Sequence, residues 1–285
     1  MENNNKPITA KPIDVAAAFR GKAPRLFKWL PNFMINYLRK IVHEDACNEF
    51  YIKHINSTSG EFCTASIELF YPIIKTVNTE LWPKDSSYLI AANHPLGGLD
   101  GLILMALVSK MRTDIKFPAN DLLMAFKPLH TYFIPINKHG SNKTNMIKFN
   151  EAFNETNAMI YFPAGMVSRK NDKGEIRDLD WRKTFVSKCI ETQRDIYPTF
   201  VDAQNSNFFY NLSRWRTKLG IKANIEMLYL SDEMFRQAGK TITIVAGKPI
   251  SWQLLDSSKT HKEWADLIKA HVYKLKDNPD AEFQF

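Results

Sequence analysis

A histidine and an aspartate lie close together in the sequence, where a hydrophobic run gives way to a glycine-containing loop. The run ends at Ala92, and the loop that follows reads Asn93-His94-Pro95-Leu96-Gly97-Gly98-Leu99-Asp100. A histidine can remove a proton near neutral pH, and a carboxylate on its other ring nitrogen can hold the tautomer that leaves a lone pair facing a substrate. His94 and Asp100 therefore suit acyl transfer to a hydroxyl or an amine.

The same residues also have a purely structural interpretation. Asp100 stands where the N-cap of a following helix is expected, and aspartate is among the best N-cap residues. On this interpretation His94 is a strand-end residue whose hydrogen bonds are made within the fold. Because short motifs produce many false matches, the loop by itself leaves both interpretations open.

The segments around this loop predict alternating strands and helices. Hydrophobic and β-branched runs predict strands over 88–92, 131–136, 158–162, 196–201 and 241–246. Helical spacing predicts helices over 102–110, 142–157, 181–192 and 261–276. Pro135 marks its strand as an edge strand or a strand end, and the residues around Pro118 are expected to form a short connection. The alternation predicts an α/β fold, a single domain with a mixed, largely parallel central sheet flanked by helices.

Polar groups follow three of the predicted strands. They are His94 with Asp100, Asn137 with Lys138, and Gly165 with Ser168 and Arg169. In an open α/β sheet, the loops at the carboxyl ends of the strands converge on one crevice. The convergence would supply a base, two cations and glycine amides, which together can hold an anionic acceptor and stabilise an oxyanion.

The amino-terminal part of the chain is expected to differ from the rest. We expect a flexible N-terminus over residues 1–22, a helical N-terminal segment over 23–80 and the α/β domain over 81–285. Within 24–42, aromatic and basic residues recur at helical spacing, with a break at Pro31. This face either packs on the domain or rests in an anionic lipid interface. The aromatic and basic stretch 208–218 also has two interpretations: it lines a groove for a fatty chain, or it forms an ordinary helix.

Composition limits the class of protein. The chain has 285 residues, of which 45% are hydrophobic and 24% charged, and its formal net charge is +8. This balance is typical of a folded protein with an anionic partner. Its three cysteines form no CxxC pattern, which indicates neither a disulfide framework nor a zinc site. The start of the chain has no signal-peptide pattern, and no apolar run reaches the ~20 residues of a membrane span. We therefore expect a cytoplasmic protein, peripheral to the membrane, with no metal.

Three blocks of the sequence resemble a known enzyme family. Asn93 to Asp100, Phe162-Pro163-Ala164-Gly165-Met166-Val167-Ser168-Arg169 and Ile196-Tyr197-Pro198 occur in that order within about 86–201. They resemble the glycerophospholipid acyltransferase superfamily, the PlsC-like enzymes, and more closely its hemolysin-like bacterial branch, which includes acyltransferases of ornithine and glycine lipids.

The resemblance implies an enzyme that moves a fatty acyl group from an acyl carrier protein or coenzyme A thioester to the hydroxyl of a lysolipid or lyso-aminolipid. It implies no tightly bound cofactor and no nucleic acid, with the inner face of an anionic membrane as a partner. His94 would be the general base and Asp100 its carboxylate partner. The substrate-binding residues would be Asn93, Gly97, Gly98, Lys138, Gly165, Ser168 and Arg169.

The sequence departs from the family pattern at two points. Five residues separate His94 from Asp100, where the family usually has four, and Ala164 stands where a glutamate is usual. The glycines of the first loop can absorb one extra residue by bending. Two other functions stay open at this point: an N-acyltransferase acting on an amino acid, and a non-catalytic basic module that binds membranes.

Overall fold

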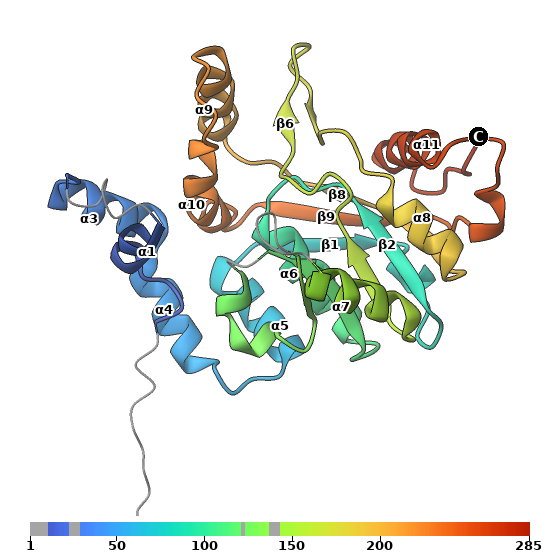
Figure 1. The fold of residues 1–285 in the computed structure, drawn as a ribbon, viewed down its shortest axis with the longest axis horizontal. Coiled ribbons are helices and arrows are strands. Elements are labelled where there is room, and N and C mark those ends of the chain that lie inside the picture. The colour runs from blue at the N-terminus through green and yellow to red at the C-terminus, as the bar shows by residue number, and fades with distance from the viewer. Residues whose placement is uncertain (1–10, 23–28, 121–122, 137–142) are drawn as a thin grey trace, which may run out of the picture.

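A seven-stranded sheet runs through the centre of the protein (Figure 1). The computed structural model describes residues 11–22, 29–120, 123–136 and 143–285. The strand order across the sheet is β1-β9-β8-β2-β5-β3-β4, and β6 and β7 form a separate hairpin. The strands are β1 Ile73–Val77, β2 Tyr88–Ala92, β3 Ile115–Ala119, β4 Phe133–Pro135, β5 Ala158–Tyr161, β6 Arg169–Lys170, β7 Ile176–Arg177, β8 Asp195–Asp202 and β9 Thr241–Ala246.

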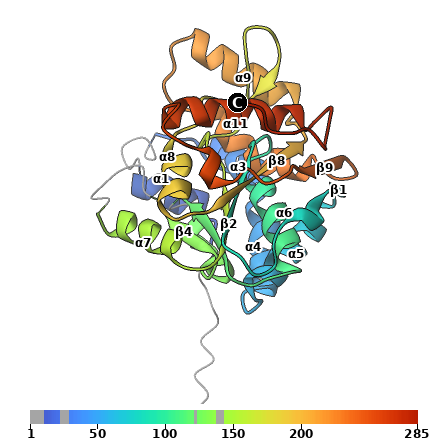
Figure 2. The ribbon, with the colours of Figure 1, turned by 90° about the vertical axis from the view of Figure 1, so that its right-hand side faces the viewer.

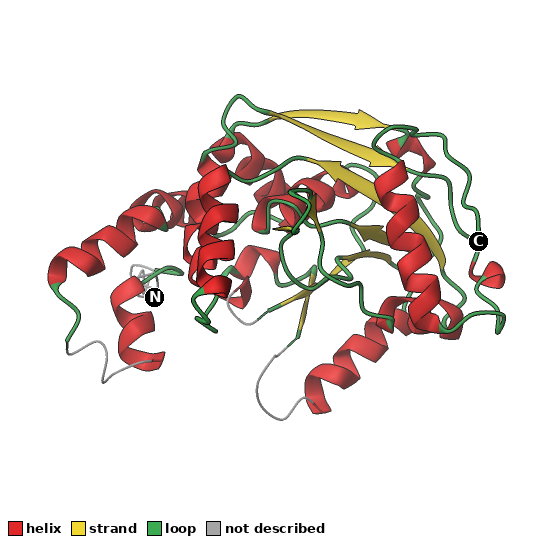
Figure 3. Cartoon of the chain, turned by 90° about the horizontal axis from the view of Figure 1, so that it is seen from above, coloured by secondary structure: helices red, strands yellow, loops and turns green. Residues whose placement is uncertain are grey.

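Helices cover both faces of the sheet (Figures 2 and 3). Along β2, Tyr88 and Ile90 pack in the core layer shared with α5 and α6, while Leu89 and Ala91 pack in the layer shared with α7, α8 and α11. The helices are α1 Val15–Lys22, α3 Asn32–Ile41, α4 Glu44–Lys53, α5 Ser59–Phe70, α6 Gly98–Ser109, α7 Lys143–Asn154, α8 Thr184–Glu191, α9 Asn207–Lys218, α10 Leu230–Phe235 and α11 His261–Lys274. Short 3₁₀ turns are η1 Thr79–Leu81, η2 Leu123–Ala125, η3 Lys127–Leu129, η4 Ile225–Tyr229 and η5 Trp252–Leu254.

The predicted fold class is confirmed. The strands β8, β2, β5, β3 and β4 are mutually parallel, and β9 joins them antiparallel to β8. The carboxyl ends of β8, β2 and β5 therefore lie side by side at one edge of the sheet. All five residues of β2 are buried, as expected for a strand covered on both faces. The polar loop that begins at Asn93 emerges from the middle of this edge.

One sequence prediction near the sheet needs correction, and another is confirmed. The residues around Pro118 form strand β3 and not a connection. Proline is tolerated there because β3 pairs with β5 only at Ile115 and Lys116, while the Phe117 amide donates to Tyr132 of the β4 side. The amide that Pro118 lacks would thus point to the side where pairing has already ended. The predicted edge position of Pro135 is confirmed, because β4 is the last strand of the sheet.

The amino-terminal boundaries also differ from expectation. Part of the stretch expected to be flexible forms α1, whose Val15 amide donates to the buried Glu44 carboxylate at 3.0 Å. The predicted break at Pro31 is seen as the N-cap of α3. Strand β1 pairs with β9 in parallel, so the sheet begins at Ile73 and not after residue 80. No helix among the described residues is long and apolar enough to span a membrane.

A buried histidine on α11 makes stability depend on pH. His271 packs edge-on against Phe283, and neither ring nitrogen has a hydrogen-bond partner among the described residues. Burial lowers the pKa of His271 from its ordinary value of 6.5, Lys274 adds to the lowering and Glu282 opposes it. The folded state therefore binds this proton less readily than the unfolded state does.

We expect the free energy of unfolding to keep its full value at pH values above the ordinary pKa of His271. It should decrease as the pH drops below that value and through the lowered pKa of the folded state. His271→Leu should flatten that fall, because leucine cannot be protonated. Denaturant titrations between neutral and mildly acidic pH measure the effect. His261→Leu, at the exposed start of the same helix, is the control. Equal slopes for wild type and His271→Leu would contradict the prediction.

Candidate active site

The first turn of α6 brings the predicted histidine and aspartate together. His94 Nδ1 lies 3.0 Å from Asp100 Oδ2, across the loop that connects β2 to α6. The five intervening residues fit because Gly97 adopts φ +84°, a conformation that residues with a Cβ rarely adopt. A Cβ on Gly97 would also lie only 3.2 Å from the Leu230 side chain. The longer spacing therefore preserves the contact.

Asp100 is completely buried, and its Oδ2 atom has three hydrogen-bond donors. Besides His94, the amides of Leu96 and Gly97 donate to it at 2.8 Å and 3.1 Å. Burial raises the pKa of the Asp100 carboxyl above its ordinary value, and these three donors oppose the rise. Because α6 begins at Gly98, Asp100 lies inside the first turn and not at the N-cap. It both orders the start of the helix and contacts the imidazole.

The His94 ring is held on one face and open on another. It stacks on Phe162 at a centroid distance of 4.1 Å, and its side chain is 17% exposed. With Nδ1 facing Asp100, Nε2 has no hydrogen-bond partner among the described residues. When Nδ1 carries the proton, it donates to the carboxylate, and Nε2 keeps the lone pair that a general base needs.

Asp178, which sequence analysis missed, holds this loop from the other side. Its Oδ1 atom accepts the His94 amide at 3.1 Å and the Ser168 hydroxyl at 2.5 Å, while Oδ2 accepts the Trp181 indole at 2.9 Å. The Asp178 amide in turn donates to the Tyr273 hydroxyl at 2.7 Å. Asp178 follows a hairpin of charged residues, and nothing in that pattern distinguishes a buried carboxylate from a solvated one.

Asn93 and Ser168, both predicted to bind substrate, are instead structural. The Asn93 side chain accepts from the Val201 amide at 2.7 Å and donates to the Val201 carbonyl at 3.0 Å, which ties β2 to β8. Ser168 is buried, its hydroxyl donates to Asp178, and its amide donates to the His94 carbonyl at 2.8 Å. These side chains thus make hydrogen bonds within the fold that position the His94 loop.

Arg169, predicted to bind the acceptor, is held in an internal ion pair. Its Nη2 atom donates to the buried carboxylate of Glu226 at 2.9 Å, and its guanidinium lies over the Phe209 ring. Glu226 is shared with Arg216, whose Nη2 donates to the same oxygen at 3.2 Å. Burial lowers the pKa of Arg169, and Glu226 opposes that shift. The charge of Arg169 therefore stabilises the packing of α9 and η4 on the hairpin.

The predicted glycines differ in what their amides offer. The Gly97 amide donates to Asp100 and the Gly165 amide to the Phe162 carbonyl, so both are used within the fold. The Gly98 amide, in the first turn of α6, has no acceptor among the described residues. Lys138 lies outside the described residues. In the described part of the chain, no group of three or more His, Cys, Asp or Glu side chains is placed to hold a metal ion.

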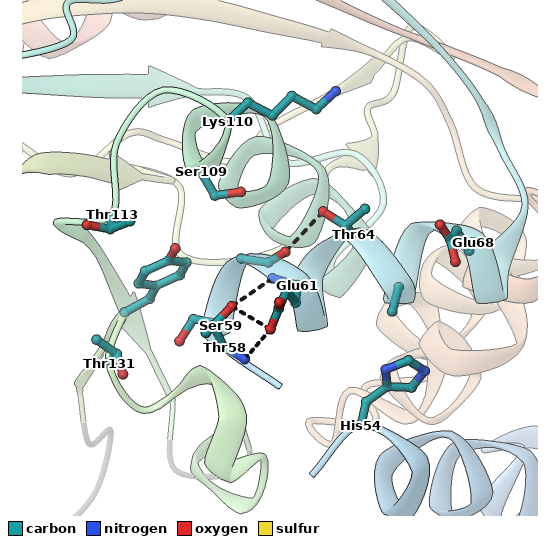
Figure 4. Close-up of a pocket in the computed structure, with 13 residues that line it drawn as sticks. His54, Thr58, Ser59, Glu61, Thr64, Glu68, Ser109, Lys110, Thr113 and Thr131 are labelled. Atoms are coloured by element: carbon teal, nitrogen blue, oxygen red, sulfur yellow. Dashed lines mark hydrogen bonds between the residues drawn. The ribbon is translucent and has the colours of Figure 1, made fainter. Parts of the chain in front are cut away.

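One pocket in the described structure lies away from His94. It has a volume of about 690 Å³ and lies where the start of α5 meets the end of α6, at the opposite end of α6 from Asp100 (Figure 4). Thr58, Ser59, Ser109 and Tyr132 line it, together with other hydroxyl and charged side chains. Of the predicted site residues that the structure describes, none lies in its wall.

A base held by a buried carboxylate at the carboxyl end of a central strand is a site typical of enzymes that deprotonate a nucleophile. The chain matches the family described as Acyltransferase over residues 17–282. It belongs to that family, and it is an acyltransferase.

The chain aligns with two curated relatives over almost their full length. The chain is 43% identical over 265 residues to the lyso-glycine lipid O-acyltransferase of Bacteroides thetaiotaomicron, covering 92% of this chain and 97% of that protein. It is 42% identical to the enzyme of the same name from Phocaeicola vulgatus, covering 92% and 95%. The crystal structure of the 1-acyl-sn-glycerophosphate (LPA) acyltransferase PlsC from Thermotoga maritima aligns over 80% of each chain, with 13% identity and a TM-score of 0.49.

Replacing Asp178 should weaken catalysis through the position of His94. Asp178→Asn keeps the shape but removes the charge and one acceptor oxygen from the loop. We expect kcat to fall by about tenfold to a hundredfold, because small displacements of a catalytic group are costly. Steady-state kinetics with a thermal melt measure both effects. Asp172→Asn, on the exposed hairpin, is the control. An unchanged kcat would show that Asp178 does not position the base.

Replacing Arg169 should lower the stability of the fold more than it weakens acceptor binding. Arg169→Met leaves Glu226 with one cation, and we expect a loss of roughly 1–3 kcal/mol in the free energy of unfolding. Denaturant titration measures the loss, and the KM for the acceptor should change less than about threefold, or ~0.65 kcal/mol. A large rise in the KM for the acceptor without a loss of stability would show instead that Arg169 binds the acceptor.

Proposed function

We propose that this protein is a lyso-glycine lipid O-acyltransferase that transfers a fatty acyl group from a thioester donor to the hydroxyl of its acceptor. The observation that carries acyl transfer is the 3.0 Å contact between His94 Nδ1 and Asp100 Oδ2, which leaves Nε2 facing outward. We infer the identity of the acceptor from the names of the two relatives, which match this chain along almost their whole length.

The reaction needs one base and no covalent acyl-enzyme. The acceptor hydroxyl lies beside His94 Nε2, which removes its proton as the oxygen attacks the thioester carbonyl. Asp100 stabilises the imidazolium that forms, because its carboxylate lies on the other ring nitrogen. When the tetrahedral intermediate collapses, the C–S bond breaks and the thiolate takes the proton from the imidazolium. The products are the acylated lipid and the free thiol.

The oxyanion of that intermediate requires a hydrogen-bond donor. The sequence suggested the amides of Gly97, Gly98 or Gly165, and two of these already donate within the fold. We assign the role to the amide of Gly98, which lies at the positive end of α6. The Cα atom of Gly98 is also closely packed, because a Cβ added to Gly98 would lie 3.3 Å from Met234 Sδ.

The donor is a thioester of acyl carrier protein or of coenzyme A, and the enzyme works at a membrane surface because its acceptor is a lipid. Purified protein is incubated with each donor and a panel of lyso-glycine lipid, lysophospholipid and free glycine, and the products are followed by mass. Donor consumption that depends on lyso-glycine lipid supports the proposal. Consumption with free glycine would favour N-acyl transfer, and consumption with lysophospholipid would change the acceptor.

Removing the base should abolish turnover while the fold survives. We expect His94→Ala to lower kcat by about 10² to 10⁴, the usual contribution of a general base, and Asp100→Asn to lower it by a comparable factor. Kinetics with detergent-dispersed acceptor and a melting curve measure these effects.

The matched control is His43→Ala. His43 Nε2 also lies 3.0 Å from a carboxylate, that of Asp232, but at the junction of α3 and α4 and with Arg236 on the other oxygen. This variant should keep wild-type kcat in detergent. Equal activities of His94→Ala and wild type would refute the mechanism.

A further inference from the structure

We propose that α3 and the α9–η4 region form one docking surface for the anionic face of a lipid membrane. The proposal rests on the proposed function, since an enzyme that acylates a lipid must reach the membrane. The docking surface is defined here by six side chains, three from each region: Trp29, Phe33 and Tyr37, and Phe208, Trp215 and Leu219.

These side chains point out of the core although they are large and apolar. Trp29 is 86% exposed, Phe33 72%, Trp215 69% and Leu219 73%. Single exposed apolar residues are common on proteins, whereas a contiguous group of aromatic residues marks a binding surface. Aromatic side chains flanked by lysine and arginine are typical of segments that lie in the membrane interface.

The two halves are joined, although about 190 residues separate them in the chain. The hydroxyls of Tyr37 and Tyr229 lie 2.8 Å apart, which connects α3 to η4. The ring of Tyr229 packs edge-on against Phe208 at 4.9 Å, which continues the contact to α9. Figure 1 shows α3 and α9 towards one side of the molecule, away from α8 and α11. The six residues therefore belong to one surface and not to two separate patches.

The charge of these segments selects the partner. Residues 29–42 and 207–225 contain six lysines and arginines and no aspartate or glutamate. Of the six, Arg39 and Arg216 form ion pairs with Glu44 and Glu226. The others have no ion-pair partner among the described residues, and they are Lys40, Arg214, Lys218 and Lys222. Each cation near an anionic membrane contributes about 1 kcal/mol, so the surface fits an anionic leaflet better than a neutral one.

The elements that carry or adjoin the docking surface also contact the His94 loop. The helix that follows η4 places Leu230 and Met234 against Gly97 and Gly98. On the other side, Phe209 of α9 lies under the guanidinium of Arg169, next to the residue whose amide holds the His94 carbonyl. A membrane bound to this surface would thus bring a lipid acceptor to the loop that carries the base.

The test measures vesicle binding without turnover, so that it does not depend on acyl transfer. Vesicles of phosphatidylcholine are compared with equimolar phosphatidylcholine and phosphatidylglycerol by co-sedimentation, using wild type and His94→Ala. Both proteins should bind the anionic vesicles and bind the neutral ones weakly. The double variant Trp215→Ser with Leu219→Ser should lose at least about tenfold in affinity, and Lys218→Gln with Lys222→Gln about tenfold or more on anionic vesicles.

Leu254→Ser is the matched control, since Leu254 is exposed on η5, which packs against α8 at the other side of the molecule. It should bind as wild type does. In detergent, the Trp215 and Leu219 variant should keep wild-type kcat, which separates loss of docking from loss of catalysis.

Three results would overturn the proposal. One is equal vesicle binding by the double variant and Leu254→Ser. Another is a dimer in solution that the double variant dissociates, with no vesicle binding by wild type, which would assign the surface to a second copy of the chain. The third is binding to acyl carrier protein that the same variants abolish while vesicle binding persists. Loss of turnover in every assay with vesicle binding intact would instead contradict the proposed function alone.

Discussion

The buried carboxylate of Asp100 constrains everything around it. A charge with no exposed surface is costly unless it is paired and hydrogen-bonded. Its Oδ2 atom is satisfied by one imidazole and two backbone amides, and those amides exist only if the chain makes the tight turn that Gly97 allows. The same three bonds thus start α6, fix the loop after β2 and orient His94. Structure and chemistry share one carboxylate, so a change that removes Asp100 would release the imidazole and also leave the two amides at the start of the helix without their acceptor.

A second buried carboxylate holds the loop from behind. Asp178 receives the amide of His94, the hydroxyl of Ser168 and the indole of Trp181, and it is itself anchored through Tyr273 of α11. His94 therefore lies between two carboxylates: Asp100 contacts its imidazole, and Asp178 accepts its backbone amide. This arrangement leaves the Nε2 edge as the part of His94 that a substrate can approach, because Phe162 covers the face of the ring.

The short helix α10 connects the site to the outer helices. Leu230 and Met234 pack on Gly97 and Gly98, while Asp232 on the opposite side pairs with His43 between α3 and α4. The Ser231 hydroxyl also donates to the Val42 carbonyl at 2.8 Å. One helix thus touches both the His94 loop and the amino-terminal helices. The amino-terminal segment therefore packs on the domain through α10, which is one of the two arrangements that the sequence left open.

The sequence by itself predicted most of the strands and the contact between His94 and Asp100. Alternation of apolar runs predicted β2, β5, β8 and β9 with nearly the right bounds, and the loop chemistry of His94 and Asp100 is readable from residue types because both lie in one short segment. Tertiary structure decided the roles of the other predicted residues. Asn93, Ser168 and Arg169 carry polar groups that could bind a ligand, yet in the fold they bond to Val201, Asp178 and Glu226, none of which is a sequence neighbour. A side chain's free hydrogen-bonding capacity is what remains after folding, and only the three-dimensional contacts define that remainder.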